Sequence, residues 1–308
     1  MAGRRPVEEA LVAGREARRL LVVPSRREAL ERIVLHATNL RIPVVEVEGG
    51  TITALAGFDG HQGVALVVAP RRYASLEEIL AFAGRRGEPP FVLVLDSLED
   101  PQNVGTLLRS AEAAGVHGVL FPTHRQAPLT PAAVKASSGA VEHLLLAPVD
   151  DLAGALADLH VRGVRVVGSE ADAPMTARQT DLRGPIAIVI GSEGQGLGPA
   201  VRRRCDAFMR IPMVGAVGSL NAAVAGSILV FEAAIQRDPE GARPRREPGP
   251  GEARPRSGAP GPIPPDGAAM GTPDDAPVDE TPADRAPVDD AAEDAGDAQG
   301  DLLPGDAD

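Results

Sequence analysis

Two stretches late in the chain combine glycine with small polar residues in a way that suits the binding of a ligand. Residues 191–198 read GSEGQGLG and follow an apolar run at 186–190 that is typical of a buried strand. Glycine has no Cβ, so a loop with four glycines lets the backbone approach a ligand closely. Residues 211–213 (IPM) and 218–221 (GSLN) come next, and the second of these opens a predicted helix. Together the two stretches predict a pocket built mostly from main chain.

The glycine pattern excludes several well-known kinds of site. A dinucleotide-binding fingerprint needs G-x-G-x-x-G, and a match begun at Gly194 meets Pro199 where the third glycine is required. A phosphate-binding P-loop needs a lysine after its glycine, and Leu197 follows Gly196 instead. The nucleophile elbow G-x-S-x-G is absent, because Ser192 directly follows a glycine. What remains is a small ligand held largely by backbone groups, with few side chains to do chemistry.

The sequence gives no indication of a metal site, a disulfide bond or a membrane-spanning segment. The six histidines (36, 61, 117, 124, 143 and 160) show no ligand spacing, so no metal is expected. The single cysteine, Cys205, excludes an internal disulfide, suits a reducing compartment and is expected to be a small buried residue. The first residues are too charged for a signal peptide, and no apolar run approaches the ~20 residues of a membrane span. We expect a soluble, cytoplasmic protein.

Residues 1–70 predict a small α/β unit. The apolar spacing indicates helices over 6–14 and 26–40, and strands near 20–23, 43–47 and 63–68. The unit is rich in arginine, with Arg4, Arg5, Arg15, Arg18, Arg19, Arg26 and Arg27. Such a cluster is either a solvated face or a surface for the phosphate groups of a nucleic acid.

Residues 71–90 are predicted to link this unit to a second one at 91–237. Ser75 and Glu78 form a capping box for a short helix in the linker, and the composition changes near residue 88. In the second unit, strands are expected at 91–95, 116–120, 144–146, 164–167 and 186–190, with helices between them and a last helix at 220–236. Because the first of these strands is apolar on both faces, the alternation predicts an open parallel sheet with helices on both sides.

The composition changes again at residue 238. The segment 238–308 holds 18 acidic and 6 basic residues, 14 of the 29 prolines and few large apolar residues. It accounts for the formal net charge of −12, since residues 1–237 carry 25 charges of each sign. Such a segment cannot bury enough apolar surface to offset its chain entropy, so a disordered tail is predicted. The neutral remainder is compatible with an anionic partner.

Three segments of the second unit resemble the motifs of a known family. They are residues 100–115 (DPQNVGTLLRSAEAAG), residues 188–197 (IVIGSEGQGL), and residues 211–213 with 219–225 (IPM and SLNAAVA). In order and spacing they are similar to the SpoU class of SPOUT RNA 2′-O-ribose methyltransferases, over about 90–237. Residues 6–70 resemble the L30e-like substrate-binding domain that precedes the catalytic domain in bacterial ribosomal RNA members.

The resemblance carries expectations about fold, cofactor and assembly. It implies a parallel α/β fold whose C-terminal segment passes through a loop to form a trefoil knot, a topology that ordinary chain-threading rules would not predict. It also implies that S-adenosylmethionine binds in the knot in a bent form, and that the catalytic domain forms a homodimer. The family's cofactor contacts correspond to Gly191, Ile211 and Leu220, largely through backbone. This agrees with the main-chain pocket inferred above.

Methyl transfer to a ribose hydroxyl makes modest demands on side chains, because the sulfonium group is already activated and positioning matters most. The candidate catalytic residues are Asn103, Arg109, Glu193, Ser219 and Asn221. Arg109 follows Leu108 on its helix and is expected to lean over the pocket rim, and the family assigns it as the base for the 2′-hydroxyl proton. A guanidinium group has a pKa above about 12, however, and is normally charged at neutral pH. A charged Arg109 that holds the RNA phosphate is therefore the competing role.

Several of these residues also have a structural explanation. Asn103 could be a helix cap, and Glu193 could be a solvated loop residue. Ser219 and Asn221 could cap the last helix, which is compatible with ligand contact. A further family-like stretch holds two weaker candidates for RNA contact, Lys135 and Glu142. With six phenylalanines, one tyrosine and no tryptophan, the chain must hold RNA through phosphates, shape and the 2′-hydroxyl rather than by stacking.

The main functional hypothesis is 2′-O-methylation of a guanosine ribose in 23S ribosomal RNA, because the N-terminal unit resembles that of ribosomal RNA enzymes. A transfer RNA methyltransferase and an antibiotic-resistance enzyme that modifies ribosomal adenosine share the chemistry and remain alternatives. A third alternative is an RNA-binding module without catalysis, which the intact Asn103, Arg109, Glu193 and Asn221 argue against. Neither a membrane nor DNA is expected as a partner.

Overall fold

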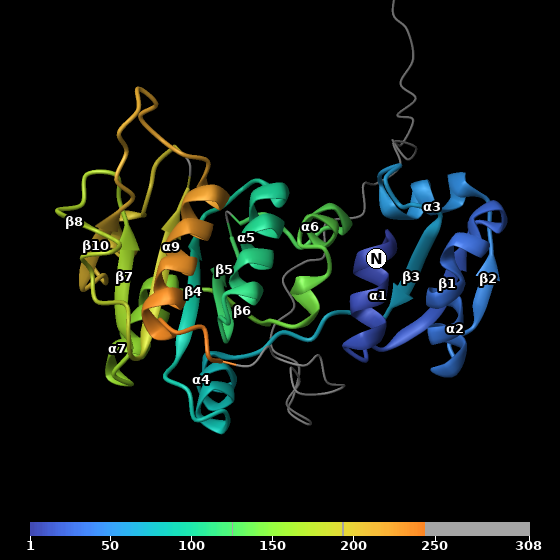
Figure 1. The fold of residues 1–308 in the computed structure, drawn as a ribbon, viewed down its shortest axis with the longest axis horizontal. Coiled ribbons are helices and arrows are strands. Elements are labelled where there is room, and N and C mark those ends of the chain that lie inside the picture. The colour runs from blue at the N-terminus through green and yellow to red at the C-terminus, as the bar shows by residue number, and fades with distance from the viewer. Residues whose placement is uncertain (125, 193, 244–308) are drawn as a thin grey trace, which may run out of the picture. The chain divides into compact units, whose positions relative to one another are not determined.

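The computed structural model describes residues 1–124, 126–192 and 194–243 (Figure 1). The predicted catalytic residue Glu193 and most of the predicted tail, 244–308, lie outside these described residues. Within them the strands form two sheets, one of three strands in the order β2-β1-β3 and one of seven in the order β6-β5-β4-β9-β7-β10-β8. The mixed α/β class predicted from the sequence is confirmed.

The smaller sheet belongs to the N-terminal unit. Its elements are α1 (Arg4–Val12), β1 (Ala17–Val22), η1 (Pro24–Arg26), η2 (Glu28–Leu30), α2 (Glu31–Asn39), β2 (Val44–Glu46), α3 (Gly49–Ala56) and β3 (Val64–Val68). Strand β1 lies in the middle, parallel to β2 and antiparallel to β3. Apolar residues of α1, β1, α2 and β3 fill the core between them, among them Val7, Leu20, Ile33 and Leu66.

Two helices of this unit differ from the sequence prediction. The helix expected over 26–40 begins as the two 3₁₀ turns η1 and η2, and the α-helix proper starts only at Glu31. Helix α3 was not predicted. It begins with Gly49 and Gly50 and continues with Thr51 and Ile52, all residues of low helix propensity. The tertiary packing of Ile52, which is fully buried, decides the conformation instead.

The larger sheet forms the second unit. Its strands are β4 (Phe91–Asp96), β5 (Gly118–Pro122), β6 (Leu145–Val149), β7 (Arg165–Ser169), β8 (Met175–Thr176), β9 (Ile186–Gly191) and β10 (Ala207–Arg210). Its helices are α4 (Leu76–Arg85), α5 (Pro101–Ala113), α6 (Pro131–Ala136), η3 (Ala140–Glu142), α7 (Leu152–Val161), α8 (Pro199–Arg202) and α9 (Ala222–Arg237). The strand pairings in the described part of the chain are parallel throughout this sheet, as predicted. No helix among the described residues is both long and apolar enough to span a membrane.

Helices cover both faces of the seven-stranded sheet. Helices α5 and α9 lie side by side on one face (Figure 1), where Leu107 and Leu229 join the core. Helices α4, α7 and α8 cover the other face with residues such as Ile79 and Leu156. Strands β4 and β9 are consequently buried along their whole length, which explains their unbroken apolar sequences. Helix α4 lies in the segment predicted as a linker and has the predicted capping box, so that segment contributes to this core.

Contacts within the chain join the N-terminal unit to the second unit. Glu142 is 4% exposed and pairs with Arg71 and, at 4.0 Å, with Arg15. The ammonium group of Lys135 lies 4.9 Å from the centre of the Phe58 ring. A buried carboxylate with two arginine partners cannot contact RNA, so the weaker expectation for Glu142 is wrong. Lys135 is exposed but packs against the N-terminal unit.

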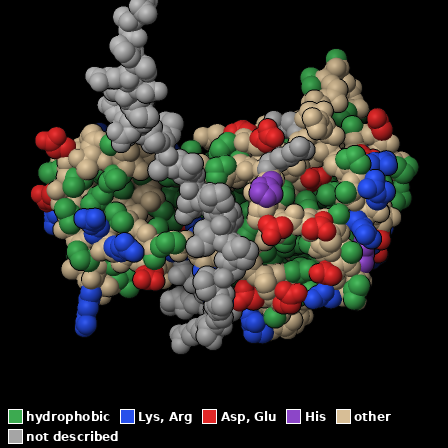
Figure 2. Space-filling model, turned by 180° about the vertical axis from the view of Figure 1, so that it is seen from behind, with side chains coloured by type: hydrophobic (Ala, Val, Ile, Leu, Met, Phe, Trp, Pro, Cys, Tyr) green, Lys and Arg blue, Asp and Glu red, His purple; other side chains and the backbone are tan. Residues whose placement is uncertain are grey.

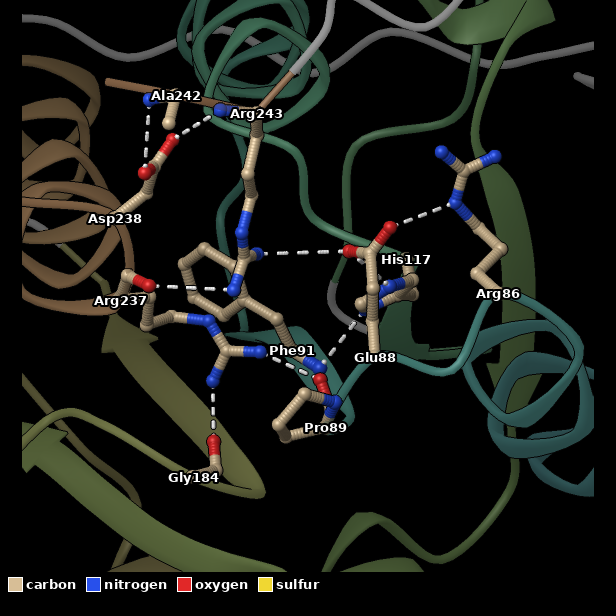
Figure 3. Close-up of polar contacts among 10 residues, drawn as sticks. All are labelled: Arg86, Glu88, Pro89, Phe91, His117, Gly184, Arg237, Asp238, Ala242 and Arg243. Carbon is tan, nitrogen blue, oxygen red and sulfur yellow. Dashed lines mark hydrogen bonds and ion pairs between the residues drawn. The ribbon is translucent and has the colours of Figure 1, made fainter. Parts of the chain in front are cut away.

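A polar cluster holds the end of α9 against the sheet (Figure 3). Arg237 donates hydrogen bonds to the carbonyl oxygens of Pro89 and Gly184, and its guanidinium group lies 4.8 Å from the centre of the Phe91 ring. Burial, reinforced by the neighbouring Arg243, lowers the pKa of Arg237 to about 10. Glu88, beside it, binds three basic groups: Arg86, His117 and Arg243. These contacts fix the last turn of the helix whose first turn lies at the predicted site.

Candidate active site

A pocket of about 460 Å³ lies at the carboxyl edge of the seven-stranded sheet. It is formed where β7, β9 and β10 end and where α9 begins, and ligands of open α/β sheets bind at this edge. The three predicted cofactor residues, Gly191, Ile211 and Leu220, all line it, and so does the predicted catalytic residue Ser219. The two late turns singled out in the sequence therefore meet at one pocket.

The glycine loop after β9 folds back on its own backbone. A Cβ on Gly191 would lie 2.3 Å from the carbonyl carbon of Gly196, so only glycine fits at the end of this strand. Two backbone hydrogen bonds of 3.0 Å between Ser192 and Gly196 close the turn. The sequence predicts that this glycine allows the close approach of a ligand. In the structure the nearest neighbour of Gly191 is the loop itself, and the loop in turn forms one wall of the pocket.

Asp96 fixes the other end of the glycine loop. It is the last residue of β4, is 7% exposed, and accepts a 2.7 Å hydrogen bond from the backbone N–H of Gly198. Its second oxygen accepts a 3.3 Å hydrogen bond from the hydroxyl of Ser97. Asp96 is not among the site residues predicted from the sequence. The available signal was an acidic residue that ends a strongly apolar strand, at the edge of a parallel sheet where ligands bind.

Asn221 and Asn103 connect the first turns of α9 and α5. The Asn221 side-chain oxygen accepts hydrogen bonds from the backbone N–H groups of Ala223 at 3.0 Å and Val224 at 3.2 Å, so Asn221 caps α9. Its amide nitrogen donates a 2.9 Å hydrogen bond to the Asn103 side-chain oxygen. Asn103 is not the helix cap considered above, because Asp100 caps α5. Two of the predicted catalytic residues are thus in direct contact, and Asn221 directly follows Ser219 and Leu220, which line the pocket.

Arg109 lies apart from this pair. It is exposed on α5, six residues beyond Asn103, which corresponds to roughly 9 Å along the helix axis. It is not among the described residues that line the pocket. Its expected position over the rim is therefore not seen within a single chain, and its catalytic role stays a prediction.

An apolar stripe runs along the exposed side of α9, next to α5. Its residues are Val224, Ile228, Phe231 and Ile235, each between 41% and 59% exposed. Their spacing of four, three and four residues places them on one helix face. Large exposed apolar patches are typical of interaction sites.

A charged pair that the sequence analysis did not consider lies at the pocket. Glu170 and Arg202 both line it, and the guanidinium group of Arg202 donates to the two carboxylate oxygens of Glu170 at 2.6 and 3.1 Å. The same guanidinium group lies 4.8 Å from the centre of the Phe208 ring. The hydrogen bond to Glu170 raises the pKa of Arg202 above its usual value. Arg202 therefore stays charged, and its two hydrogen bonds orient the Glu170 carboxylate in the pocket wall.

The fold and the pocket together define a class of protein, the SPOUT-type RNA methyltransferases. Residues 90–231 match the model of the SpoU rRNA Methylase family, and residues 2–74 match the model for RNA 2′-O ribose methyltransferase substrate binding. Two solved structures resemble the chain. AviRb of Streptomyces viridochromogenes, a SpoU methyltransferase in complex with AdoMet, has a TM-score of 0.65 at 26% identity and covers 77% of this chain and 89% of its own. The AdoMet-bound rRNA methyltransferase of Sinorhizobium meliloti has a TM-score of 0.61 at 26% identity, over 76% and 85%.

Relatives among known proteins identify the family. YacO of Bacillus subtilis, named for the TrmH family of tRNA/rRNA methyltransferases, is 45% identical over 181 residues, which are 59% of this chain and 73% of YacO. A Staphylococcus saprophyticus protein named for the same family is 38% identical over 239 residues, 77% of this chain and 96% of that protein. The chain belongs to the TrmH family of the SpoU class and is an RNA 2′-O-methyltransferase. The resemblance drawn from the three motifs is confirmed, whereas the trefoil knot and the domain boundaries stay predictions.

Proposed function

We propose that the protein transfers a methyl group from S-adenosylmethionine to the 2′-hydroxyl of a guanosine in 23S ribosomal RNA. The observation that supports this most is the convergence of Gly191, Ile211 and Leu220 on one pocket, in a chain whose N-terminal unit matches a substrate-binding domain of RNA 2′-O-methyltransferases. The alternatives, a transfer RNA target or a ribosomal adenosine, share the same chemistry and differ in the RNA that is bound.

The pocket suits an adenosyl ligand in size and in chemistry. Its volume lies within the range of about 300–1,000 Å³ that is usual for small-molecule sites. The glycine loop offers main-chain donors and acceptors, and Leu197, Met209 and Leu229 add apolar surface. We assign the binding of the donor to Gly191, Ile211 and Leu220, largely through their backbone. The bound donor supplies a methyl group on a positively charged sulfur.

The side chains near the pocket position the reactants. The hydrogen bond between Asn103 and Asn221 fixes the start of α9 and presents two amide groups near the pocket. Ser219 lines the pocket and is available to the ribose. Charged Arg109 holds an RNA phosphate, which suits an exposed guanidinium group better than the role of a base. Glu193 is retained as a catalytic candidate on its sequence position alone.

The arginines of the N-terminal unit provide a surface for RNA phosphates. Arg5, Arg18, Arg19, Arg26 and Arg27 are exposed. Figure 2 shows several basic side chains on this unit, at the left of that view. Arg15 does not belong to this surface, because it is buried against Glu142. Binding through phosphates predicts an affinity for RNA that falls steeply with salt.

A homodimer is the assembly that we assign to the catalytic unit. The apolar stripe on α9 would be covered by a second copy, and a two-fold interface uses the same patch on both subunits. Arg109 is an exposed residue of α5, which packs beside α9. We assign it to the face that the dimer would use.

Transfer of a tritiated methyl group from S-adenosylmethionine tests the proposed reaction. Purified protein is incubated with unmodified 23S ribosomal RNA, with 16S ribosomal RNA and with transfer RNA, and the RNA is digested to nucleosides for mass spectrometry. We expect 2′-O-methylguanosine from 23S ribosomal RNA alone, and loss of most activity with Arg109→Ala. A base-methylated nucleoside would contradict the chemistry, and labelling of transfer RNA alone would contradict the target.

Mapping ribose methylation in cells with and without the gene identifies the nucleotide. We expect one 23S position to lose its methyl group when the gene is removed. We place the reaction in the cytoplasm, because the single thiol suits a reducing compartment.

A further inference from the structure

Glu170 occupies a position from which it can recognise a ligand in the pocket. It directly follows the last residue of β7, at the carboxyl edge of the sheet. The segment 169–172 lines the pocket from a third side, separate from the glycine loop and from the 211–220 segment. None of the residues assigned so far to the donor comes from this third side.

The carboxylate of Glu170 is held in one orientation. Arg202 binds both of its oxygens, at 2.6 and 3.1 Å, and is itself stacked on Phe208. The backbone N–H of Glu170 donates a 3.1 Å hydrogen bond to the carbonyl of Met209 in the adjacent strand β10. A carboxylate can accept about four hydrogen bonds, so two remain for a ligand after Arg202 has used two. A fixed carboxylate with spare acceptor capacity selects a group with two neighbouring donors.

The ribose of an adenosyl group offers such a pair of donors in its 2′- and 3′-hydroxyls. Hydrogen bonds to an ionised acceptor are roughly twice as strong as neutral ones. An acidic residue that binds the ribose hydroxyls is the solution that dinucleotide-binding α/β folds use at the same edge of the sheet. We propose that Glu170 binds the ribose hydroxyls of the methyl donor and that Arg202 positions it. This inference rests on the proposed function of the pocket.

Asp172 is a second acidic residue of the pocket wall and serves as a control for Glu170. It also lines the pocket and comes from the same segment, but it is exposed and no side-chain hydrogen bond holds its carboxylate in the described structure. A mobile exposed carboxylate loses more side-chain entropy on binding than a fixed one. The proposal therefore distinguishes two acids two residues apart.

Equilibrium binding measured by calorimetry tests the proposal without any RNA. The ligands are S-adenosylhomocysteine and its 2′-deoxy and 3′-deoxy analogues, and the proteins are wild type, Glu170→Gln, Asp172→Asn and Arg202→Met. For wild type, we expect the loss of either hydroxyl to weaken binding by about 10- to 100-fold. For Glu170→Gln, we expect S-adenosylhomocysteine to bind at least tenfold more weakly, with little further loss for the deoxy analogues. Asp172→Asn should behave as wild type, and Arg202→Met should fall between.

Three outcomes would overturn the proposal. The first is full discrimination against the deoxy analogues in Glu170→Gln, and the second is loss of discrimination in Asp172→Asn. The third is wild-type protein that binds all three ligands equally. Glu170→Asp, which keeps the charge, should recover part of the discrimination if Glu170→Gln is unstable. If wild type binds S-adenosylhomocysteine without discrimination, the proposed function survives and this inference fails. If wild type binds none of the ligands, both fail.

Discussion

Asn221 makes two kinds of contact with one side chain. Its oxygen caps α9, and its amide nitrogen reaches Asn103 on α5. The cap alone would explain an asparagine at this position, but a serine or threonine would cap as well. The bond to Asn103 needs a longer side chain with a donor, which asparagine supplies. The contact between α9 and α5 therefore explains why this position holds asparagine rather than serine or threonine.

Substitution of Asn221 can separate the helix cap from the contact with Asn103. Asn221→Ser keeps a capping oxygen but is too short to reach Asn103, so we expect the free energy of unfolding to change by less than about 0.5 kcal/mol. Methyl transfer should nevertheless fall by roughly tenfold or more, because small misplacements of reacting groups are costly. Asn221→Ala should lose the cap as well, at about 1 kcal/mol. Urea unfolding measures the free energy of unfolding, and a methyl-transfer assay measures the rate. An Asn221→Ser variant with the wild-type rate would show that methyl transfer does not need the contact with Asn103.

The residues that could be predicted from the sequence are those whose motif is local. Gly191, Ile211, Leu220 and Ser219 lie in short segments with recognisable patterns, and they meet at one pocket. Asp96 could not be predicted in the same way, because its partner Gly198 lies 102 residues later in the chain. Glu170 likewise depends on Arg202, which is 32 residues away. The residues around a single acidic residue at the end of a strand do not indicate which distant residue it will bind.

At the scale of the elements, α5 packs against both α6 and α9. A Cβ on Gly105 would lie 2.4 Å from the carbonyl oxygen of Ala133 and 2.6 Å from the Cβ of Ala136. The glycine in the middle of α5 therefore sets the distance between α5 and α6. Because α5 also carries Asn103 and Arg109, this packing positions the predicted catalytic face.

Two glycine-to-alanine substitutions in helices should have opposite effects. Gly105→Ala gains up to about 1 kcal/mol of helix propensity but forces the helices apart, at about 1–3 kcal/mol, so we expect a net loss of stability. Gly84→Ala in α4 is the matched control, because no atom lies within 4 Å of its added Cβ. We expect that variant to be stabilised by up to about 1 kcal/mol. Thermal unfolding measures the stability of both variants relative to wild type. Equal stability of Gly105→Ala and wild type would contradict the tight packing of α5 against α6.

Cys205, which follows α8, should be chemically inert in the folded protein. Burial raises the pKa of its thiol to about 12, and the nearby carboxylates of Glu170, Asp206 and Asp96 add to the effect. The thiolate is the reactive form, so we expect very slow reaction with Ellman's reagent at pH 8 and full reaction after unfolding. Since the unfolded thiol ionises near its ordinary pKa of 9.0, folding stability should fall as the pH rises from about 9 towards 12. Rapid labelling of the native protein at pH 8 would show that the thiol is accessible.

Long elements are predicted from the sequence far better than short ones. Strands β4 and β9 are buried on both faces, so their apolar runs are unmistakable. Strands β8 and β10 and helix α8 have two to four residues each, too few for a periodicity to show. Strand β10 nevertheless matters, because Met209 and Arg210 line the pocket and lead into Ile211. Strand β10, which was not predicted from the sequence, therefore contributes to the pocket.

At the scale of the whole molecule, the exposed apolar stripe on α9 favours the proposed homodimer. We expect the catalytic unit to form a homodimer, and Ile228→Glu combined with Phe231→Glu should make it monomeric by placing charges in the apolar interface. Val161→Glu is the control, because Val161 is 85% exposed on α7, on the opposite face of the sheet. Light scattering coupled to size exclusion gives the mass. A wild-type monomer, or a double variant that stays dimeric, would contradict the assignment.

The proposed reaction requires the methyl donor to bind in the pocket at the carboxyl edge of the seven-stranded sheet. A crystal structure of the protein grown with S-adenosylhomocysteine tests this most directly. We predict electron density for the ligand in the pocket between the glycine loop and the 211–220 segment, with its polar groups bonded to main chain at Gly191, Ile211 and Leu220. Ligand density at any other place, with this pocket vacant, would contradict the account.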